Sequence, residues 1–335
     1  MDAILTEALD ALLQDQCTPE VLRDIYATAN ANALWDLIDA SGFANALLSE
    51  AEEGASLNLP QAYPLFELCG KTLLPLPLPE TMLARKALSE ATLPIPAGAI
   101  GFALAYHNTQ SNRIITTDAP FSCTATHLLV ESSTDVRLLS RRDAESSPAL
   151  FPLDHELSWD QATWEQAPRV PNISELRVLM ACVSSARLAG TLLETFDQTL
   201  QYANERKQFG RPIGKFQAIQ HQLSVLAEHT FAAHMAAKIG CNSPDWQPQL
   251  AQVAVAKACT SDAAAQLAAG AHAIHGAIGF TQELDLQLYT RSLHHGRHSA
   301  GSESWWHAVL GEHLHQQTSP NTLDMLRELN ELHAS

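Results

Sequence analysis

A long apolar segment, residues 176–205, most strongly limits how this 335-residue chain can fold. The segment is rich in alanine and contains no proline, so it predicts a single long helix. Two further helical runs, at about residues 216–239 and 245–269, each follow turn-forming residues, at 210–214 and 242–244. Long helices that present small residues to each other are typical of a four-helix bundle. We therefore expect the last part of the chain to form such a bundle.

Residues 1–90 also have helical character, since leucines recur at helical spacing. Thr18-Pro19 is a typical helix start, in which a capping residue precedes a proline at the first helical position. A helix is expected over residues 60–71 and another over residues 80–89. The proline-rich segment Pro75–Pro79 between them cannot lie inside an ordinary helix, so we expect it to be an extended connector.

The pattern changes to short β-prone runs between residue 94 and about residue 164. Turn-rich segments separate four such runs: residues 100–106, 113–117, 126–131 and 136–140. The prediction is a mainly α protein with a small central β domain. Its expected parts are an N-terminal helical domain at residues 1–93, a reduced β domain at 94–168 and a C-terminal helical bundle at 169–335.

The charge of the chain argues against nucleic acid as a partner. Twenty Lys and Arg residues stand against 37 Asp and Glu residues, which gives a net charge of −17. Such a chain repels phosphate backbones and anionic membrane surfaces. We find no run of about 18 apolar residues and expect no membrane span.

The six cysteines are scattered and form no CxxC pair, which excludes a zinc ribbon and a thioredoxin-like motif. Scattered cysteines are typical of a reducing compartment. Acidic residues interrupt the first apolar stretch, so no secretory signal is expected. These features together predict a cytoplasmic protein.

Several common site motifs are missing, among them the dinucleotide-binding GxGxxG, the P-loop and the GxSxG elbow. His294, His295 and His298 cluster, and His313 and His315 follow near the end. We interpret the first cluster as a solvated loop, because no Asp, Glu or Cys accompanies it at metal-ligand spacing. No metal site is expected.

The segment Tyr202–Gln217 carries chemistry between two long helices. The Arg206 guanidinium suits a phosphate, and Phe209 suits stacking on a planar ring. From chemistry alone, a basic helix end that satisfies its own carbonyl groups is the stronger interpretation. A second segment, His275–Glu283, contains Gly276 and Gly279, which allow close backbone approach or an ordinary helix-breaking turn.

These two segments resemble the flavin-dependent acyl-CoA dehydrogenases. Residues 202–217 are similar to the YxxERxxFGxPIxxFQ signature of that family, and residues 274–291 to its QxHGGxGFTxExDLxLYxR signature. The resemblance implies a helical N-terminal domain, a central β domain and a C-terminal four-helix bundle. It also implies FAD at a subunit interface, with Arg206, Phe209, Gln217 and Gly276 as the cofactor-binding residues.

The reaction that the resemblance implies is α,β-desaturation of an acyl-CoA, with a glutamate as the base. The family places this glutamate nine residues beyond the arginine that Arg291 matches, where this chain has Ala300. Other members place it 26 residues before the arginine that Arg206 matches, where this chain has Met180. Neither side chain accepts a proton, and Glu303 is the fallback candidate.

Further departures affect the flavin pocket. The family Gln before HGG is Ala273 here and its second Gly is Ala277, and the TEPxxGSD and WITN segments are missing. The short length and absent base resemble the shortened subunit of heteromeric steroid-side-chain acyl-CoA dehydrogenases. The resemblance thus implies an α2β2 complex in which a paralogous subunit supplies the glutamate, with electron-transfer flavoprotein as electron acceptor.

Two alternatives remain open at this point. The chain can be a self-sufficient homo-oligomeric dehydrogenase with a displaced base, such as Glu303. It can also be a non-catalytic scaffold subunit that retains the fold for protein contacts.

Overall fold

A computed structural model describes residues 2–133, 135–316 and 324, with side chains from residue 4 onward. The described chain divides into two compact units. The first contains residues 2–66, 74–183 and 244–247, and the second contains residues 67–73, 184–243 and 248 onward. Each unit is described by itself below.

The first unit begins with helices, as the leucine spacing predicts. These are α1 (Asp2–Gln16), α2 (Pro19–Thr28), α3 (Asn32–Ala40), α4 (Leu59–Lys71, which ends in the second unit) and α5 (Leu78–Glu90), with 3-10 turns η1 (Phe43–Asn45) and η2 (Glu50–Glu52). Thr18 caps α2 as expected, since its side chain accepts a hydrogen bond from Val21 N. The expected connector Pro75–Pro79 is shorter than predicted, because Pro79 lies in the first turn of α5, where a missing N–H is tolerated.

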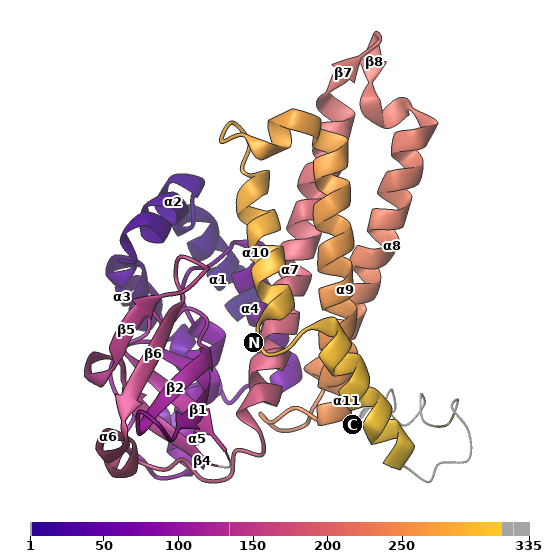
Figure 1. Ribbon diagram of the computed structural model, residues 1–335. Coiled ribbons are helices and arrows are strands. Elements are labelled where there is room, and N and C mark those ends of the chain that lie inside the picture. Colours follow the sequence, from indigo (N-terminus) through magenta and orange to yellow (C-terminus); the bar gives the residue numbers. More distant parts are fainter. Residues whose placement is uncertain (1, 134, 317–323, 325–335) are drawn as a thin grey trace. The chain divides into compact units, whose positions relative to one another are not determined.

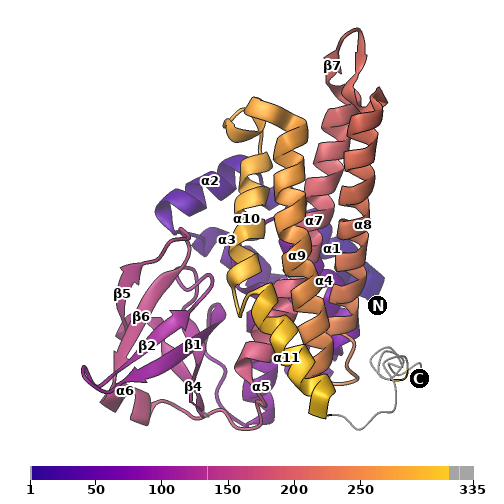
Figure 2. The ribbon, with the colours of Figure 1, turned by 45° about the vertical axis from the view of Figure 1, so that its right-hand side comes forward.

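A six-stranded mixed sheet completes the first unit (Figure 2). Its strands are β1 (Ile100–Asn108), β2 (Arg113–Asp118), β3 (His127–Ser132), β4 (Asp135–Ser140), β5 (Glu145–Pro148) and β6 (His155–Asp160), with the turn η3 (Arg141–Asp143) and the helix α6 (Gln161–Gln166). The order is β4-β3-β1-β2-β6-β5; β1 and β3 are parallel, and the other neighbours are antiparallel.

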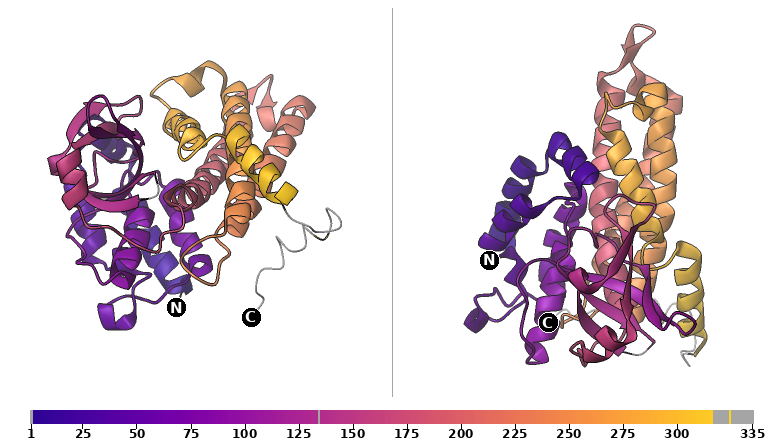
Figure 3. Two further views of the ribbon diagram at one scale, coloured as in Figure 1. Left: turned by 60° about the horizontal axis from the view of Figure 1, so that its bottom comes forward. Right: turned by 60° about the vertical axis from the view of Figure 1, so that its left-hand side comes forward.

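The four predicted strands are present, but β5 and β6 are additional. Leu157 and Trp159 of β6 alternate with polar residues and are fully buried, whereas β5 is exposed along its whole length. The helix α5 packs against the interior strand β1, and Thr81 Oγ1 accepts a hydrogen bond from Ile100 N at 2.9 Å. Figure 3 shows these strands in purple to magenta beside the indigo to purple helices of the same unit.

The second unit is the predicted helical bundle. Its elements are α7 (Leu176–Glu205, whose first turns belong to the first unit), the hairpin β7 (Lys207–Gln208) and β8 (Arg211–Pro212), η4 (Ile213–Lys215), α8 (Gln217–Gly240), α9 (Leu250–His275), η5 (Gly276–Phe280), α10 (Leu286–His298) and α11 (Glu303–Gln316). The helix α9 packs against α8, α10 and α11 (Figure 1). Small residues permit the close packing: a Cβ added at Gly240 of α8 would lie 2.6 Å from the Ala256 Cβ of α9.

The boundaries of the third long helix differ from the prediction. It begins at Leu250 rather than near residue 245, after the prolines Pro244 and Pro248, and it continues to His275 rather than stopping near residue 269. Gly276 ends it, with φ of +67°. His294, His295 and His298 lie on α10 and not in the predicted loop.

Within the described residues, one helix is long and apolar enough to cross a membrane by length and composition. This helix is α7, but 78% of its apolar window is buried inside the protein. Burial of this extent is that of a core helix in a bundle.

Candidate functional site

The hairpin between α7 and α8 holds an aromatic side chain in solvent. Phe209 and Gly210 form its turn, and both have positive φ, +51° and +82°. A two-residue turn of this kind matches the twist of a β-hairpin. The Phe209 side chain is 92% exposed and makes an edge contact with the Phe216 ring, at a centroid distance of 6.2 Å. A phenyl ring kept in water in this way is available for contact with another planar group.

A cavity of about 430 Å³ lies beside this hairpin, at the adjacent ends of α7 and α9. Tyr202 in the last turn of α7 and Arg206 just after that helix line it, together with His275 at the end of α9 and Gly276 and Ala277 after it. The structure therefore brings together the two segments that the sequence singled out. Phe209 and Gln217 are not among the lining residues; Gln217 is exposed in the first turn of α8.

The wall of this cavity is built by a stacked ring pair. The imidazole ring of His275 stacks on the phenol ring of Tyr202, with centroids 4.2 Å apart and an interplanar angle of 22°. The His275 Nδ1 atom lies 2.8 Å from the carbonyl oxygen of Ala271. Burial lowers the pKa of His275, with the Ala271 hydrogen bond opposing the shift, so its ring is neutral at pH 7.

A second histidine stabilises the segment that follows. His272 stacks on Phe280, with centroids 4.2 Å apart, and its Nε2 atom lies 3.0 Å from the Thr290 hydroxyl. Burial lowers the pKa of His272, and the nearby His275 and His294 lower it further. Both histidines are therefore neutral and help to position the η5 turn; neither contributes a positive charge for binding an anion.

The cavity fits the phosphate part of a dinucleotide. The Arg206 side chain is exposed at the rim and offers a fork of N–H donors. Gly276 has φ +67° and ψ −149°, and no atom lies within 4 Å of the position of a Cβ, so its backbone is open to a ligand. Arg206 and Gly276 would hold the phosphates, while Phe209 would meet a planar ring outside the cavity.

The two positions at which the family carries its base hold apolar side chains in buried surroundings. Ala300 is fully buried, with φ of +58°, and its carbonyl oxygen accepts a hydrogen bond from Trp306 Nε1 at 3.1 Å. Met180 is 4% exposed within α7. Neither position offers a group that can accept a proton.

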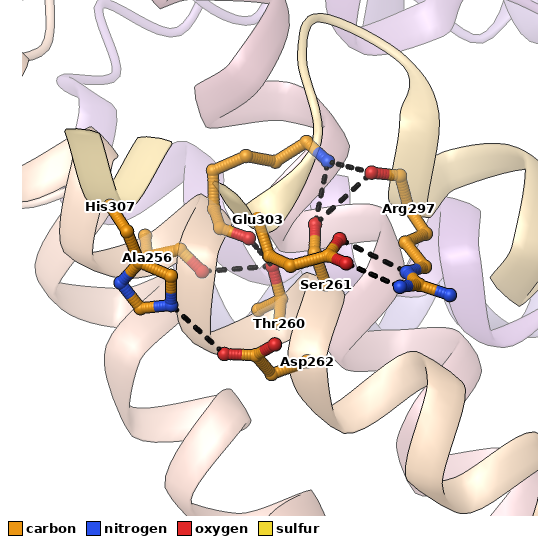
Figure 4. A network of polar contacts seen from close by, with 8 residues as sticks. Ala256, Thr260, Ser261, Asp262, Arg297, Glu303 and His307 are labelled. Atoms are coloured by element: carbon orange, nitrogen blue, oxygen red, sulfur yellow. Dashed lines mark hydrogen bonds and ion pairs between the residues drawn. The ribbon is translucent and has the colours of Figure 1, made fainter. Parts of the chain in front are cut away.

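Glu303, the fallback candidate, is held by an arginine (Figure 4). The Nε atom of Arg297 donates to Glu303 Oε2 at 3.0 Å, and a second hydrogen bond joins Arg297 Nη2 to Glu303 Oε1. This pairing lowers the pKa of Glu303 to about 2. A carboxylate with so low a pKa is a weak general base at neutral pH.

Lys257 of α9 also contacts the end of α10, next to the Arg297–Glu303 pair. Sequence reasoning did not identify this lysine. Its Nζ atom is fully buried and donates to Ser261 Oγ and to the carbonyl oxygens of Gly296 and Arg297, at 2.8, 2.8 and 3.0 Å. The ammonium group thus caps the last turn of α10. The signal was weak, since a single lysine in an alanine-rich helix is usually an exposed residue.

Within the described part of the chain, no group of three or more His, Cys, Asp or Glu side chains is arranged to hold a metal ion. The histidines of α10 therefore offer no such cluster.

Comparison with known proteins finds relatives of this chain. Residues 174–314 match the family model "Acyl-CoA dehydrogenase, C-terminal domain". The chain is 26% identical to acyl-CoA dehydrogenase IpdE2 of Mycobacterium tuberculosis over 298 residues, which cover 87% of this chain and 90% of that protein.

Two solved complexes have the same fold. The ChsE4-ChsE5 complex of Mycobacterium tuberculosis is similar with a TM-score of 0.82 at 19% identity, over 95% of this chain and 98% of that chain. A Tcur3481-Tcur3483 steroid acyl-CoA dehydrogenase variant is similar with a TM-score of 0.81 at 21% identity, over 94% and 98%.

Proposed function

The chain belongs to the acyl-CoA dehydrogenase family, and we propose that it is the base-lacking subunit of an FAD-dependent, hetero-oligomeric acyl-CoA dehydrogenase. The family is one of oxidoreductases. The proposed complex is an α2β2 heterotetramer with a paralogous subunit, and we expect it to act in the cytoplasm.

One observation carries this proposal: the chain keeps the groups that would contact a cofactor and has lost the group that would move a proton. Arg206 and Gly276 line one open cavity, and Phe209 is held in solvent beside it. By contrast, the two base positions hold the buried side chains of Ala300 and Met180. A scaffold subunit without a cofactor would have no physical need for an exposed phenyl ring and an open arginine.

The chemistry divides between the two subunits. Bound FAD supplies the hydride acceptor for α,β-desaturation of an acyl-CoA thioester. From this chain, Arg206 would neutralise phosphate charge, the Gly276 backbone would approach the phosphates closely, and Phe209 would reach a planar ring of the cofactor. The partner subunit would supply the carboxylate that takes the α proton. Electron-transfer flavoprotein is the expected electron acceptor.

The structural relatives support the heteromeric part of the proposal. Both solved relatives named above are complexes of two differently named proteins, and one is described as a steroid acyl-CoA dehydrogenase. We therefore propose an acyl-CoA with a steroid side chain as the substrate class. The self-sufficient alternative is weaker, because Arg297 holds Glu303 as an ionised carboxylate with a pKa of about 2.

The test is to purify this chain alone and together with a paralogous acyl-CoA dehydrogenase subunit, and to record the flavin spectrum and the mass in solution. We expect a colourless chain alone and a yellow heterotetramer with dehydrogenase activity. In the complex, Arg206→Ala should lower the flavin content. Arg211→Ala is the matched control, because Arg211 lies in the same hairpin over the Phe216 ring and does not line the cavity.

A yellow, active homo-oligomer of this chain alone would contradict the proposal. Glu303 would then become the first residue to substitute. Equal flavin content in the Arg206→Ala and Arg211→Ala complexes would contradict the assignment of the cofactor contacts.

A further inference from the structure

The first unit contains a second cavity, which shares no residue with the one at the ends of α7 and α9. Its volume is about 480 Å³, within the range of roughly 300–1,000 Å³ that small-molecule sites occupy. Three parts of the unit form its walls: the corner between α2 and α3, the segments that lead into β1 and β3, and the η3 turn after β4.

Small apolar side chains make one part of this cavity. Five alanines line it, together with the buried ring of Trp35: Ala29, Ala31, Ala97, Ala99 and Ala125. Because an alanine side chain is a single methyl group, these residues leave open space between the α2–α3 corner and the sheet. A compact apolar or planar group would find van der Waals contact there.

Two arginines give another part of the cavity wall a positive charge. Arg141 and Arg142 are consecutive residues of η3, and both line the cavity. The Arg141 side chain interacts with the Cys123 thiol, and its buried Nε atom has no hydrogen-bond partner within the described structure. A buried N–H group without an acceptor is unfavourable, and a bound anion would supply that acceptor.

The neighbouring titratable groups provide no matching negative charge inside the cavity. Burial raises the pKa of the Cys123 thiol, against the opposing effect of Arg141, so the thiol stays protonated. Burial lowers the pKa of His127, with Asp143 opposing and Arg142 adding to the shift, so the ring is neutral at pH 7. None of the described residues that line the cavity is acidic, although the whole chain carries 37 acidic residues.

Two carboxylates lie near the cavity, and they act electrostatically on its lining residues: Asp154 on Cys123 and Asp143 on His127. Asp154 accepts a hydrogen bond from Phe121 N at 3.0 Å, and Asp143 is exposed on the η3 turn. Neither lines the cavity.

We propose that this cavity binds a small phosphate monoester. Its phosphate would accept hydrogen bonds from Arg141 and Arg142, and its compact apolar body would lie over the alanines and Trp35. Two guanidinium groups on consecutive residues suit a dianion better than a singly charged carboxylate. The site is independent of the dehydrogenase activity proposed above and is tested without it.

The experiment is titration calorimetry on the full chain, with its partner subunit where the complex is needed, using phenyl phosphate as the probe. We expect binding of phenyl phosphate, weaker binding of benzoate and no binding of benzyl alcohol. Arg141→Gln and Arg142→Gln should each weaken phenyl phosphate binding at least about tenfold. Arg169→Gln is the matched control, because Arg169 pairs with Asp135 outside the cavity and is largely exposed; its binding should change less than about twofold.

A cavity-filling variant separates the two parts of the site. Ala97 is an exposed lining residue, so Ala97→Leu narrows the apolar part and leaves both arginines in place. It should abolish phenyl phosphate binding and leave any binding of inorganic phosphate unchanged. Equal affinity of wild type and Arg142→Gln for phenyl phosphate, or no heat of binding at all, would overturn the proposal. Equal binding of benzoate and phenyl phosphate would overturn the choice of a phosphate.

Discussion

His275 stacks on Tyr202 with ring centroids 4.2 Å apart, which joins the last residue of α9 to the last turn of α7. The pair forms a wall of the cavity that Arg206 and Gly276 also line. The geometry of that cavity therefore depends on two aromatic rings from helices that are far apart in the sequence.

Replacing Tyr202 by leucine should uncouple these two helix ends. The leucine retains apolar volume but loses the ring stack, so we expect the free energy of unfolding to fall by about 0.5–1.5 kcal/mol. A double-mutant cycle with His275→Leu, measured by chemical denaturation, should yield a coupling energy of the same size.

Tyr202→Phe is the control for this cycle. It keeps the stack and loses only the contact of the hydroxyl with the His275 carbonyl oxygen, which is long at 3.4 Å. Its stability should match wild type within about 0.5 kcal/mol. A coupling energy of zero between Tyr202 and His275 would show that the stack does not join the two helices.

The exposed ring of Phe209 should matter for the cofactor and not for folding. Because its side chain is 92% exposed, Phe209→Ala should change the free energy of unfolding of the chain by less than about 0.5 kcal/mol. In the assembled complex, loss of ring stacking should weaken flavin binding about threefold to tenfold, measured by fluorescence of released flavin. Leu150→Ala, which removes an equally exposed apolar side chain, should leave flavin binding unchanged.

Two glycines with open surroundings should respond in opposite ways to alanine. At Gly276, φ is +67° and no atom lies within 4 Å of a new Cβ, so Gly276→Ala should destabilise the protein by backbone strain alone, by about 1–3 kcal/mol. Gly311 in α11 is equally unobstructed but lacks positive φ. Gly311→Ala should therefore stabilise the helix by up to about 1 kcal/mol. Thermal unfolding of both variants measures the contrast, and a shift in the same direction for both would refute the strain argument.

The helices were predictable because each leaves a local signal, and the proposed cofactor contacts stay a prediction that rests on local motifs. The proline-free run at residues 176–205 specifies α7 by its own composition, and Arg206 and Gly276 lie in motifs that resemble those of a family. Strand β6 was missed because its alternating pattern rests on only two apolar residues, Leu157 and Trp159. A period-2 signal that short is hard to separate from a loop.

Other features depend on contacts that no local pattern encodes. Lys257 can be buried because carbonyl oxygens of α10, some forty positions later in the chain, accept hydrogen bonds from its ammonium group. The cavity beside η3 exists because alanines from three separate segments face one another. The Arg297–Glu303 pair crosses a break between two helices, so helical spacing gives no indication of it. Each of these required the tertiary structure.

The Arg297–Glu303 pair should make stability depend on pH in a defined window. The folded-state pKa of Glu303 is about 2, below the ordinary value of 4.5. A lowered carboxylate pKa contributes stability above the unfolded-state pKa, and this contribution disappears as the pH falls from about 4.5 to about 2. Glu303→Gln should therefore reduce the free energy of unfolding by about 1–2 kcal/mol at pH 7 and by nearly nothing near pH 2.

Glu283→Gln, the same change on an exposed carboxylate, is the control and should not show this pH dependence of stability. Chemical denaturation of the three proteins between pH 2 and pH 7 measures this, and parallel curves for wild type and Glu303→Gln would mean that the ion pair does not stabilise the α10–α11 junction.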